Sequence, residues 1–189
     1  MSGLRSGPFE VALLVAAAGT VTSCASPTSS TGSAIGSWPA PRTPVLAACP
    51  RAGSGSGLPG LALRCLSAGP TVDPARLGGS PVLVTLWASW CVPCQQEMPA
   101  LQRACARYGR QVRFVGVDTE DDPDSAKDFL AAVGVHYLQV IDDWGDLLHH
   151  LGGTRLRVTL IVDARGRVVF TRRGQLRDRD LAAALASAR

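Results

Sequence analysis

Apolar and polar positions alternate after residue 80 in blocks that predict strands and helices in turn. Residues 82–86 form a nearly continuous apolar run, which is typical of a central strand covered on both faces, and residues 112–117 repeat the pattern. Residues 125–133 have a helical period and end at a glycine, a frequent helix stop. The remaining predicted elements are a strand at 137–141, a helix at 142–151, strands at 156–162 and 168–175 joined by a turn at 163–166, and a closing helix at 178–189. This order predicts an α/β domain in which helices flank a mixed sheet.

The first 44 residues follow a different pattern. An apolar run at 11–21 follows Arg5 and is too short to cross a bilayer, which needs about 20 apolar residues, but it fits the central region of a signal peptide. Residues 25–44 are rich in Ser, Thr, Gly and Pro, a composition that buries too little apolar surface to fold. We therefore expect a signal peptide that directs export, followed by a flexible tether.

Length and charge limit the classes of function. A chain of 189 residues with 46% hydrophobic residues is long enough for one packed domain plus this N-terminal appendage. The net charge is +4, and the arginines are scattered among acidic residues rather than gathered in a basic stripe, which argues against nucleic-acid binding. The 6 cysteines indicate an oxidising compartment.

Two of the cysteines carry the candidate chemistry. Cys91 and Cys94 are separated by two residues and fall where the strand at 82–86 gives way to a helix. Unpaired N–H groups at a helix N-terminus stabilise a thiolate and lower its pKa from about 8.5 to roughly 3.5–7.5, so we expect Cys91 to be the nucleophile. Cys94 then resolves the mixed disulfide and releases the substrate. A zinc site would need a second pair of ligands at ribbon or finger spacing, and the sequence has none, so no metal is predicted.

The residues around this pair resemble a known family. The chain reads Trp-Ala-Ser-Trp-Cys-Val-Pro-Cys from residue 87, and Glu97, Met98 and Pro99 follow. This long motif is similar to the active-site signature of extracytoplasmic thioredoxin-fold thiol–disulfide oxidoreductases of the TlpA/ResA/CcmG-like branch. The resemblance extends from about residue 58 to residue 189. It implies a thioredoxin-like fold with an N-terminal β-hairpin and a central α/β insertion.

The same resemblance implies a function. It indicates thiol–disulfide exchange with exported proteins, with reduction of client cysteines as in c-type cytochrome maturation, electrons from a membrane donor and no dissociable cofactor. Two alternatives stay open: an oxidase or isomerase of exported proteins, and a client-binding module with weak turnover. The motif does not fix the direction of exchange, because a change of about 30 mV in reduction potential is worth only about 1.4 kcal/mol.

The end of the predicted signal peptide also resembles a known motif. Val21-Thr22-Ser23-Cys24 is similar to the lipobox of bacterial lipoproteins, which implies cleavage before Cys24 and lipidation of that cysteine. The expected organisation is a signal peptide at 1–23, a lipidated, flexible tether at 24–44 and a thioredoxin-like domain at 45–189, anchored outside the cytoplasm to the cell membrane. A secreted protein without a lipid and a weak membrane anchor are the alternatives.

Three cysteines remain after these assignments. Cys49 and Cys65 are the favoured structural disulfide, which would close a loop of about 17 residues and stabilise the fold by roughly 3 kcal/mol. Cys105 is the competing partner. It lies four residues after Leu101 on the predicted helix face, so we interpret it as a buried small hydrophobic residue rather than a third redox thiol.

Two charged residues are expected beside the redox pair. Glu97 matches a glutamate that the resembled branch carries after its motif, and it either accepts the Cys94 proton or lies solvated near the helix N-terminus. The resemblance also places Thr85 at a position where many thioredoxin-like proteins carry a buried Asp or Asn. Arg157 replaces the cis-proline of the resembled family, and we predict a trans bond before it, since a cis bond to a non-proline residue costs roughly 2.5–4 kcal/mol. Three roles are open for the Arg157 guanidinium: it favours the Cys91 thiolate by its charge, it obstructs the substrate groove, or it turns to solvent.

The surroundings of the site complete the prediction. Residues 118–123 form an acidic cluster that lacks the ligand spacing of a calcium loop, so we predict a solvated turn there. Five residues are expected to shape the substrate groove around the cysteines: Trp90, Val92, Pro93, Arg157 and Val158.

Overall fold

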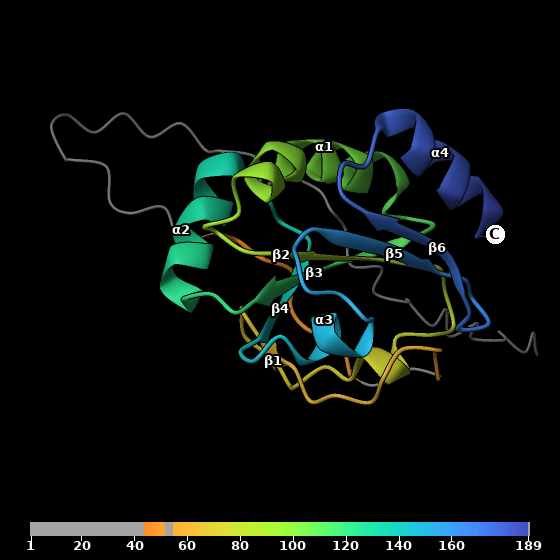
Figure 1. Ribbon diagram of the computed structural model, residues 1–189, viewed down its shortest axis with the longest axis horizontal. Coiled ribbons are helices and arrows are strands. Elements are labelled where there is room, and N and C mark those ends of the chain that lie inside the picture. The colour runs from red at the N-terminus through yellow and green to blue at the C-terminus, as the bar shows by residue number, and fades with distance from the viewer. Residues whose placement is uncertain (1–43, 52–54, 189) are drawn as a thin grey trace, which may run out of the picture.

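The computed structural model describes residues 44–51 and 55–188 (Figure 1). In chain order the elements are β1 (Arg64–Cys65), the 3-10 helix η1 (Pro74–Arg76), β2 (Val82–Trp87), α1 (Val92–Tyr108), β3 (Arg113–Thr119), α2 (Pro123–Val133), β4 (Leu138–Asp142), α3 (Asp146–His150), β5 (Val158–Val162), β6 (Val168–Arg173) and α4 (Asp178–Ser187). The predicted alternation of strands and helices is therefore confirmed.

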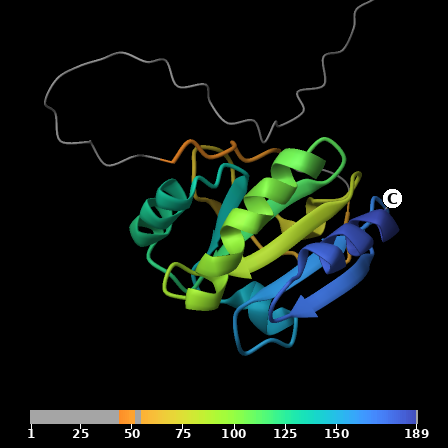
Figure 2. The same ribbon diagram turned by 90° about the horizontal axis from the view of Figure 1, so that it is seen from above.

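The strands form one mixed sheet in the order β1-β4-β3-β2-β5-β6. Strand β2 is parallel to β3, and β3 is parallel to β4, whereas β1, β5 and β6 pair antiparallel with their neighbours. The helices α1, α2 and α4 cover one face of the sheet, and α3 lies against the other (Figure 1). Seen from above, α1 crosses the middle of the sheet between α2 and α4 (Figure 2).

Alternation along the central strands divides the core in two, because side chains two residues apart point to the same face of a sheet. Leu83 and Trp87 of β2 pack in the cluster under α1. Val82, Val84 and Leu86 of the same strand pack in the cluster on the α3 side. All six residues of β2 are buried, so the prediction of a central strand covered on both faces is confirmed. The C-terminal end of β2 delivers the chain directly to the N-terminus of α1.

The helix predicted at 142–151 is shorter than expected. Strand β4 continues through Asp142, and its carboxylate then accepts hydrogen bonds from the backbone N–H groups of Asp146 and Leu147 at 2.9 and 3.0 Å. These N–H groups belong to the first turn of α3, where they have no partner within the helix. Asp142 thus ends the strand and satisfies the start of the helix that follows.

The predicted N-terminal hairpin is reduced to a small element. Leu63 and Val72 form an isolated antiparallel bridge, with reciprocal N–H to carbonyl bonds of 3.0 and 2.8 Å, while β1 pairs with β4. A disulfide joins Cys49 to Cys65 with their Cα atoms 6.0 Å apart, which ties the segment before the hairpin to β1. Cys105 is fully buried in α1, as predicted, although none of the described cysteines is a free thiol.

The predicted signal peptide, the predicted lipidation site Cys24 and nearly all of the predicted tether at 24–44 lie outside the described residues. Over the part of the chain that the structure describes, no helix combines the length and apolar character needed to cross a membrane.

Candidate active site

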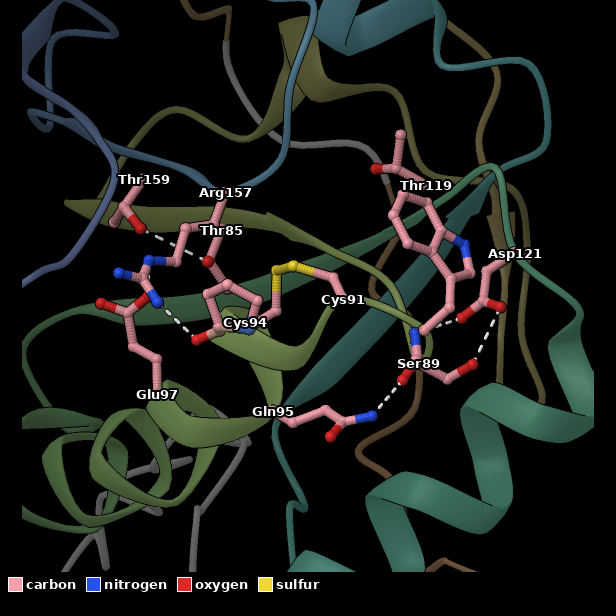
Figure 3. The surroundings of a disulfide bond; sticks show 12 residues. Thr85, Ser89, Cys91, Cys94, Gln95, Glu97, Thr119, Asp121, Arg157 and Thr159 are labelled. Carbon is pink, nitrogen blue, oxygen red and sulfur yellow. Dashed lines mark hydrogen bonds and ion pairs between the residues drawn. A yellow bond between two sulfur atoms is a disulfide. The ribbon is translucent and has the colours of Figure 1, made fainter.

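Cys91 and Cys94 are joined by a disulfide at the N-terminus of α1, with their Cα atoms 5.2 Å apart (Figure 3). Cys91 is the N-cap residue, and its carbonyl accepts the backbone N–H groups of Cys94 and Gln95 at 2.8 and 3.0 Å. No side chain caps this helix. The Cys91 side chain therefore occupies the position from which a capping acceptor usually binds the first N–H groups of a helix.

The disulfide is recessed within an exposed apolar rim. Cys91 and Cys94 are 6% and 2% exposed, whereas Trp90 and Val92 are each 58% exposed. The indole N–H of Trp90 donates to the carbonyl of Glu120 at 3.1 Å, which holds the ring beside the loop after β3. An incoming polypeptide would thus meet apolar side chains first and the sulfur atoms behind them.

A polar loop supports the chain between β2 and Cys91. The backbone N–H of Ser89 donates to Asp121, and the Ser89 hydroxyl donates to the second oxygen of the same carboxylate at 2.9 Å. The carbonyl of Ser89 accepts from the side-chain amide of Gln95 (Figure 3). Asp121 was part of the acidic cluster predicted to be a solvated turn, and its role in holding this loop was missed.

Arg157 lies against the start of α1. Its bond to Leu156 is cis, so the prediction of a trans bond was wrong. That prediction used only the local preference of a peptide bond, whereas the side chain makes long-range contacts that the sequence does not reveal. Its Nη1 group donates to the carbonyl of Pro93, and its Nε atom lies 3.0 Å from Oε2 of Glu97. The Arg157 side chain is only 11% exposed, so it does not turn to solvent, while Val158 is fully buried and does not line the open surface.

Glu97 is buried rather than solvated. Its Oε1 accepts the backbone N–H of Leu176 at 2.7 Å, and its Oε2 pairs with Arg157. Burial raises the pKa of Glu97, and the Leu176 hydrogen bond and the Arg157 charge offset part of that rise. Thr85, which takes the place of the buried acid or amide found in many thioredoxin-like proteins, shares a hydrogen bond with Thr159 at 3.3 Å. Glu97 is consequently the acidic group on α1 that the fold places beside the redox pair.

The prediction of a solvated turn at 118–123 was wrong at Asp118. Strand β3 extends through Thr119, and both residues are fully buried. Asp118 pairs in register with Trp87 and lies on the same face of β3 as Phe114, because the two are separated by an even number of positions. Burial, together with the nearby carboxylate of Asp121, raises the pKa of Asp118 to about 8. The neighbouring acidic residues suggested solvent exposure of Asp118, whereas the strand periodicity of residues 112–117, continued to residue 118, would have predicted its burial.

The fold and the cysteine pair together define a class. Two cysteines separated by two residues, at the junction of a central strand and a helix in a mixed α/β sheet, are typical of thioredoxin-like thiol–disulfide oxidoreductases. Comparison with protein families matches residues 53–185 to the family described as Redoxin. The chain belongs to the Redoxin family.

Several curated relatives carry names from the same class. The thiol:disulfide interchange protein HelX of Rhodobacter capsulatus is 34% identical over 131 residues, which cover 68% of this chain and 73% of HelX. DsbE of Yersinia pestis is 33% identical over 113 residues, covering 59% and 58% of the two chains. The thiol-disulfide oxidoreductase ResA of Bacillus cereus is 23% identical over 108 residues, covering 57% and 62%. The match thus spans less than two thirds of DsbE and ResA.

Solved structures agree with the fold. The structure of MTB dsbF in its mixed oxidized and reduced forms has a TM-score of 0.63 and 26% identity, and the match covers 70% of this chain and 99% of that one. A putative thiol:disulfide interchange protein DsbE from Chlorobium tepidum has a TM-score of 0.60 and 26% identity, covering 70% and 97%. The resemblance inferred from the motif is therefore confirmed at the level of thioredoxin-like thiol–disulfide interchange proteins.

Proposed function

We propose that this protein is an extracytoplasmic, membrane-anchored thiol–disulfide oxidoreductase that acts as a reductant of exported proteins, as in c-type cytochrome maturation. The observation that carries the proposal is the Cys91–Cys94 disulfide at an uncapped helix N-terminus, recessed behind an exposed apolar rim. The names of the relatives support exchange as the reaction. The direction and the clients are inferred from the motif resemblance.

The chemistry follows from the position of each sulfur. In the reduced protein the Cys91 thiolate attacks one sulfur of a client disulfide, forms a mixed disulfide and expels the other client sulfur as a thiolate. The Cys94 thiol then loses its proton and attacks the Cys91 sulfur, which forms the Cys91–Cys94 disulfide and releases the second client thiolate. Two electrons pass to the client, and two protons complete its thiols. A thiol–disulfide donor at the membrane then reduces the protein again.

Each sulfur has a structural reason for its role. Cys91 is the N-cap residue, where unpaired N–H groups and the helix dipole favour a thiolate. Cys94 is nearly fully buried one turn further on, so it reaches a sulfur already bonded to Cys91 more readily than one arriving from solvent. Glu97 handles the proton that Cys94 loses, and Arg157 holds that carboxylate in place through their ion pair.

The decisive experiment compares two single variants of the full chain with a disulfide-bonded exported protein. We expect Cys94→Ser to accumulate a mixed disulfide with the client, because the first attack proceeds and the resolving thiol is missing. We expect Cys91→Ser to form none. Non-reducing electrophoresis followed by mass spectrometry identifies the adduct. Equal trapping by both variants would contradict the assigned roles, and turnover by Cys91→Ser would remove the proposed mechanism.

The direction of exchange is tested by the equilibrium reduction potential of the redox pair. A value near about −270 mV, as in thioredoxin, is expected for a reductant, whereas a value near about −120 mV, as in DsbA, would make the protein an oxidant. Titration against dithiothreitol or glutathione measures it. A pair that fails to cycle would favour the client-binding alternative.

The membrane anchor is tested separately. Lipidation at Cys24 predicts that the wild-type chain enters the detergent phase on phase partitioning and that Cys24→Ala does not. Equal partitioning of the two proteins would contradict the lipid anchor, without bearing on exchange.

A further inference from the structure

A polar cavity opens beside the first turns of α1, where Pro93 of the redox motif lines it. It has a volume of about 350 Å³, near the lower end of the range of roughly 300 to 1,000 Å³ that ligand pockets occupy. Helix α1, the residue before β5 and the segment that leads into α4 form its walls. The polar and charged lining, together with the proline of the redox motif, comprises Pro93, Gln96, Glu97, Arg157, Gln175 and Arg177.

The charges of this cavity do not balance. Arg157 is matched by Glu97 at 3.0 Å. Arg177, the exposed N-cap residue of α4, also lines the cavity, and among the side chains that the structure describes no carboxylate pairs with it. Arg172 and Arg179, which lie close by in sequence, both pair with Asp180. Among the described side chains that line the cavity, two guanidinium groups thus stand against one carboxylate.

The donors in the cavity suit a carboxylate. Guanidinium groups present paired N–H donors that match the two oxygens of a carboxylate, and the amides of Gln96 and Gln175 add further donors. Glu97 in the wall disfavours a more highly charged anion by repulsion. A singly charged acidic side chain pairs with the guanidinium of Arg177 with the smallest such penalty.

The cavity also lies within reach of the reaction. Pro93 lines it and stands between the two redox cysteines in the chain, and the Pro93 carbonyl accepts from Arg157. A ligand in the cavity is therefore adjacent to the redox turn. The described lining residues include Pro93 but neither redox cysteine, so the cavity suits a residue beside the reacting cysteine of a client rather than that cysteine itself.

We infer that this cavity is a subsite for an acidic side chain next to the reacting cysteine of a client polypeptide, with Arg177 as the specificity-determining residue. The inference rests on the proposed function, because the subsite would select which client disulfides the redox pair reduces fastest. The apolar rim of Trp90 and Val92 then contacts the client outside this cavity.

The test measures the rate at which the reduced full chain reacts with three peptide disulfides that differ at one position beside the cysteine: Glu, Gln or Lys. We expect the Glu peptide to react about three- to fivefold faster than the Gln peptide, and the Lys peptide to be slowest, as for one partly exposed charge pair. The preference should shrink as ionic strength rises from about 0.01 M to about 1 M, since the Debye length falls from about 30 Å to about 3 Å.

Two variants locate the preference. Arg177→Gln should bring the ratio of Glu to Gln rates close to one, and Arg177→Glu should make the Lys peptide the fastest. Arg179→Gln is the matched control, because it removes the same charge two residues further on from a side chain that is 74% exposed and does not line the cavity. It should keep the wild-type ratio.

The outcomes separate the subsite from the exchange reaction. Three equal peptide rates in the wild type would overturn the subsite and leave exchange standing. An equal loss of preference in Arg177→Gln and Arg179→Gln would also overturn it, since a diffuse surface charge would then suffice. Failure of all three peptides to react would remove the proposed exchange function, and the subsite with it.

Discussion

Replacing Asp118 by Asn tests whether a carboxylic acid is held neutral beneath the active site. Asp118 is fully buried at the end of β3, beside the buried Trp87 in the register of the sheet. Among the described residues no cationic side chain forms an ion pair with it. Burial and the carboxylate of Asp121 together raise the pKa of Asp118 from its ordinary value of 3.8 to about 8. Asn keeps the shape of the protonated side chain and removes its ionisation.

The sign of the pH effect follows from linkage. Between the ordinary pKa of 3.8 and the native value of about 8, the folded protein holds a proton on Asp118 that the unfolded chain has released. The contribution of this group to stability is therefore present at low pH and is lost as pH rises toward 8. Its limiting slope is about −1.4 kcal/mol per pH unit. Glu97 and Asp142 also have raised pKa values, so the wild-type slope contains their shares as well.

The informative quantity is thus the difference in the free energy of unfolding between Asp118→Asn and the wild type. Between about pH 5 and about pH 7 we expect this difference in the free energy of unfolding to move by about 2–3 kcal/mol in favour of the variant. Reversible urea unfolding of the oxidised protein, followed by tryptophan fluorescence, measures it. Asp124→Asn is the matched control, because the Asp124 side chain is 87% exposed and should change stability by no more than about 0.5 kcal/mol across that range.

One result would refute the reasoning. If the stabilities of Asp118→Asn and the wild type fall in parallel with pH, then Asp118 is already ionised at the lower pH. Burial would not dominate its titration in that case. A constant loss of stability in the variant at every pH would mean that the ionised carboxylate of Asp118 makes a contact that Asn cannot replace, and it would equally contradict the titration.

Two further predictions follow from buried contacts. A double-mutant cycle with Glu97→Gln and Arg157→Gln should give a coupling free energy of about 1–3 kcal/mol, because both side chains are about nine-tenths buried. The exposed Arg64–Asp143 pair is the control and should give less than about 1 kcal/mol. Urea unfolding measures both coupling free energies. Gly116→Ala should destabilise the fold by about 2 kcal/mol or more, since its Cβ would lie 1.9 Å from the side-chain amide oxygen of Gln139, which is fully buried and accepts the indole N–H of Trp87; thermal unfolding measures the loss.

The features that were predictable from the sequence are local ones. The spacing of Cys91 and Cys94 and the apolar run before them lie within about a dozen consecutive residues, so strand, junction and helix were all visible together. The alternation of elements likewise predicted a mixed sheet with flanking helices. Trp90 and Val92 were expected around the site, and both are exposed beside it.

The features that were not predictable depend on contacts between distant parts of the chain. Arg157 donates to Pro93, a residue 64 positions away, and Leu176 donates to Glu97 across 79 positions. No periodicity encodes such pairs, so the conformation of the loop before β5 and the burial of Glu97 followed from the fold alone. The burial of Asp118 was missed for another reason. The acidic residues of the segment 118–123 suggested a solvated turn, although strand β3 continues through its first two residues, Asp118 and Thr119.

The two buried acids near the redox pair differ in a way that bears on proton transfer. Burial raises the pKa of both, but Glu97 also receives the Leu176 N–H group and the Arg157 charge, which favour its ionised form. Among the described residues no cation or N–H donor partners Asp118, and the nearby carboxylate of Asp121 raises its pKa further, so it stays protonated near neutral pH. A proton acceptor must be ionised when Cys94 loses its proton, and Glu97 is the one of the two whose neighbours favour the ionised form. We therefore expect Glu97→Gln to shift the pH profile of exchange and Asp118→Asn to leave it in place, as measured by stopped-flow kinetics. The opposite pattern would assign the proton to Asp118 and leave the Glu97–Arg157 pair with a purely structural role.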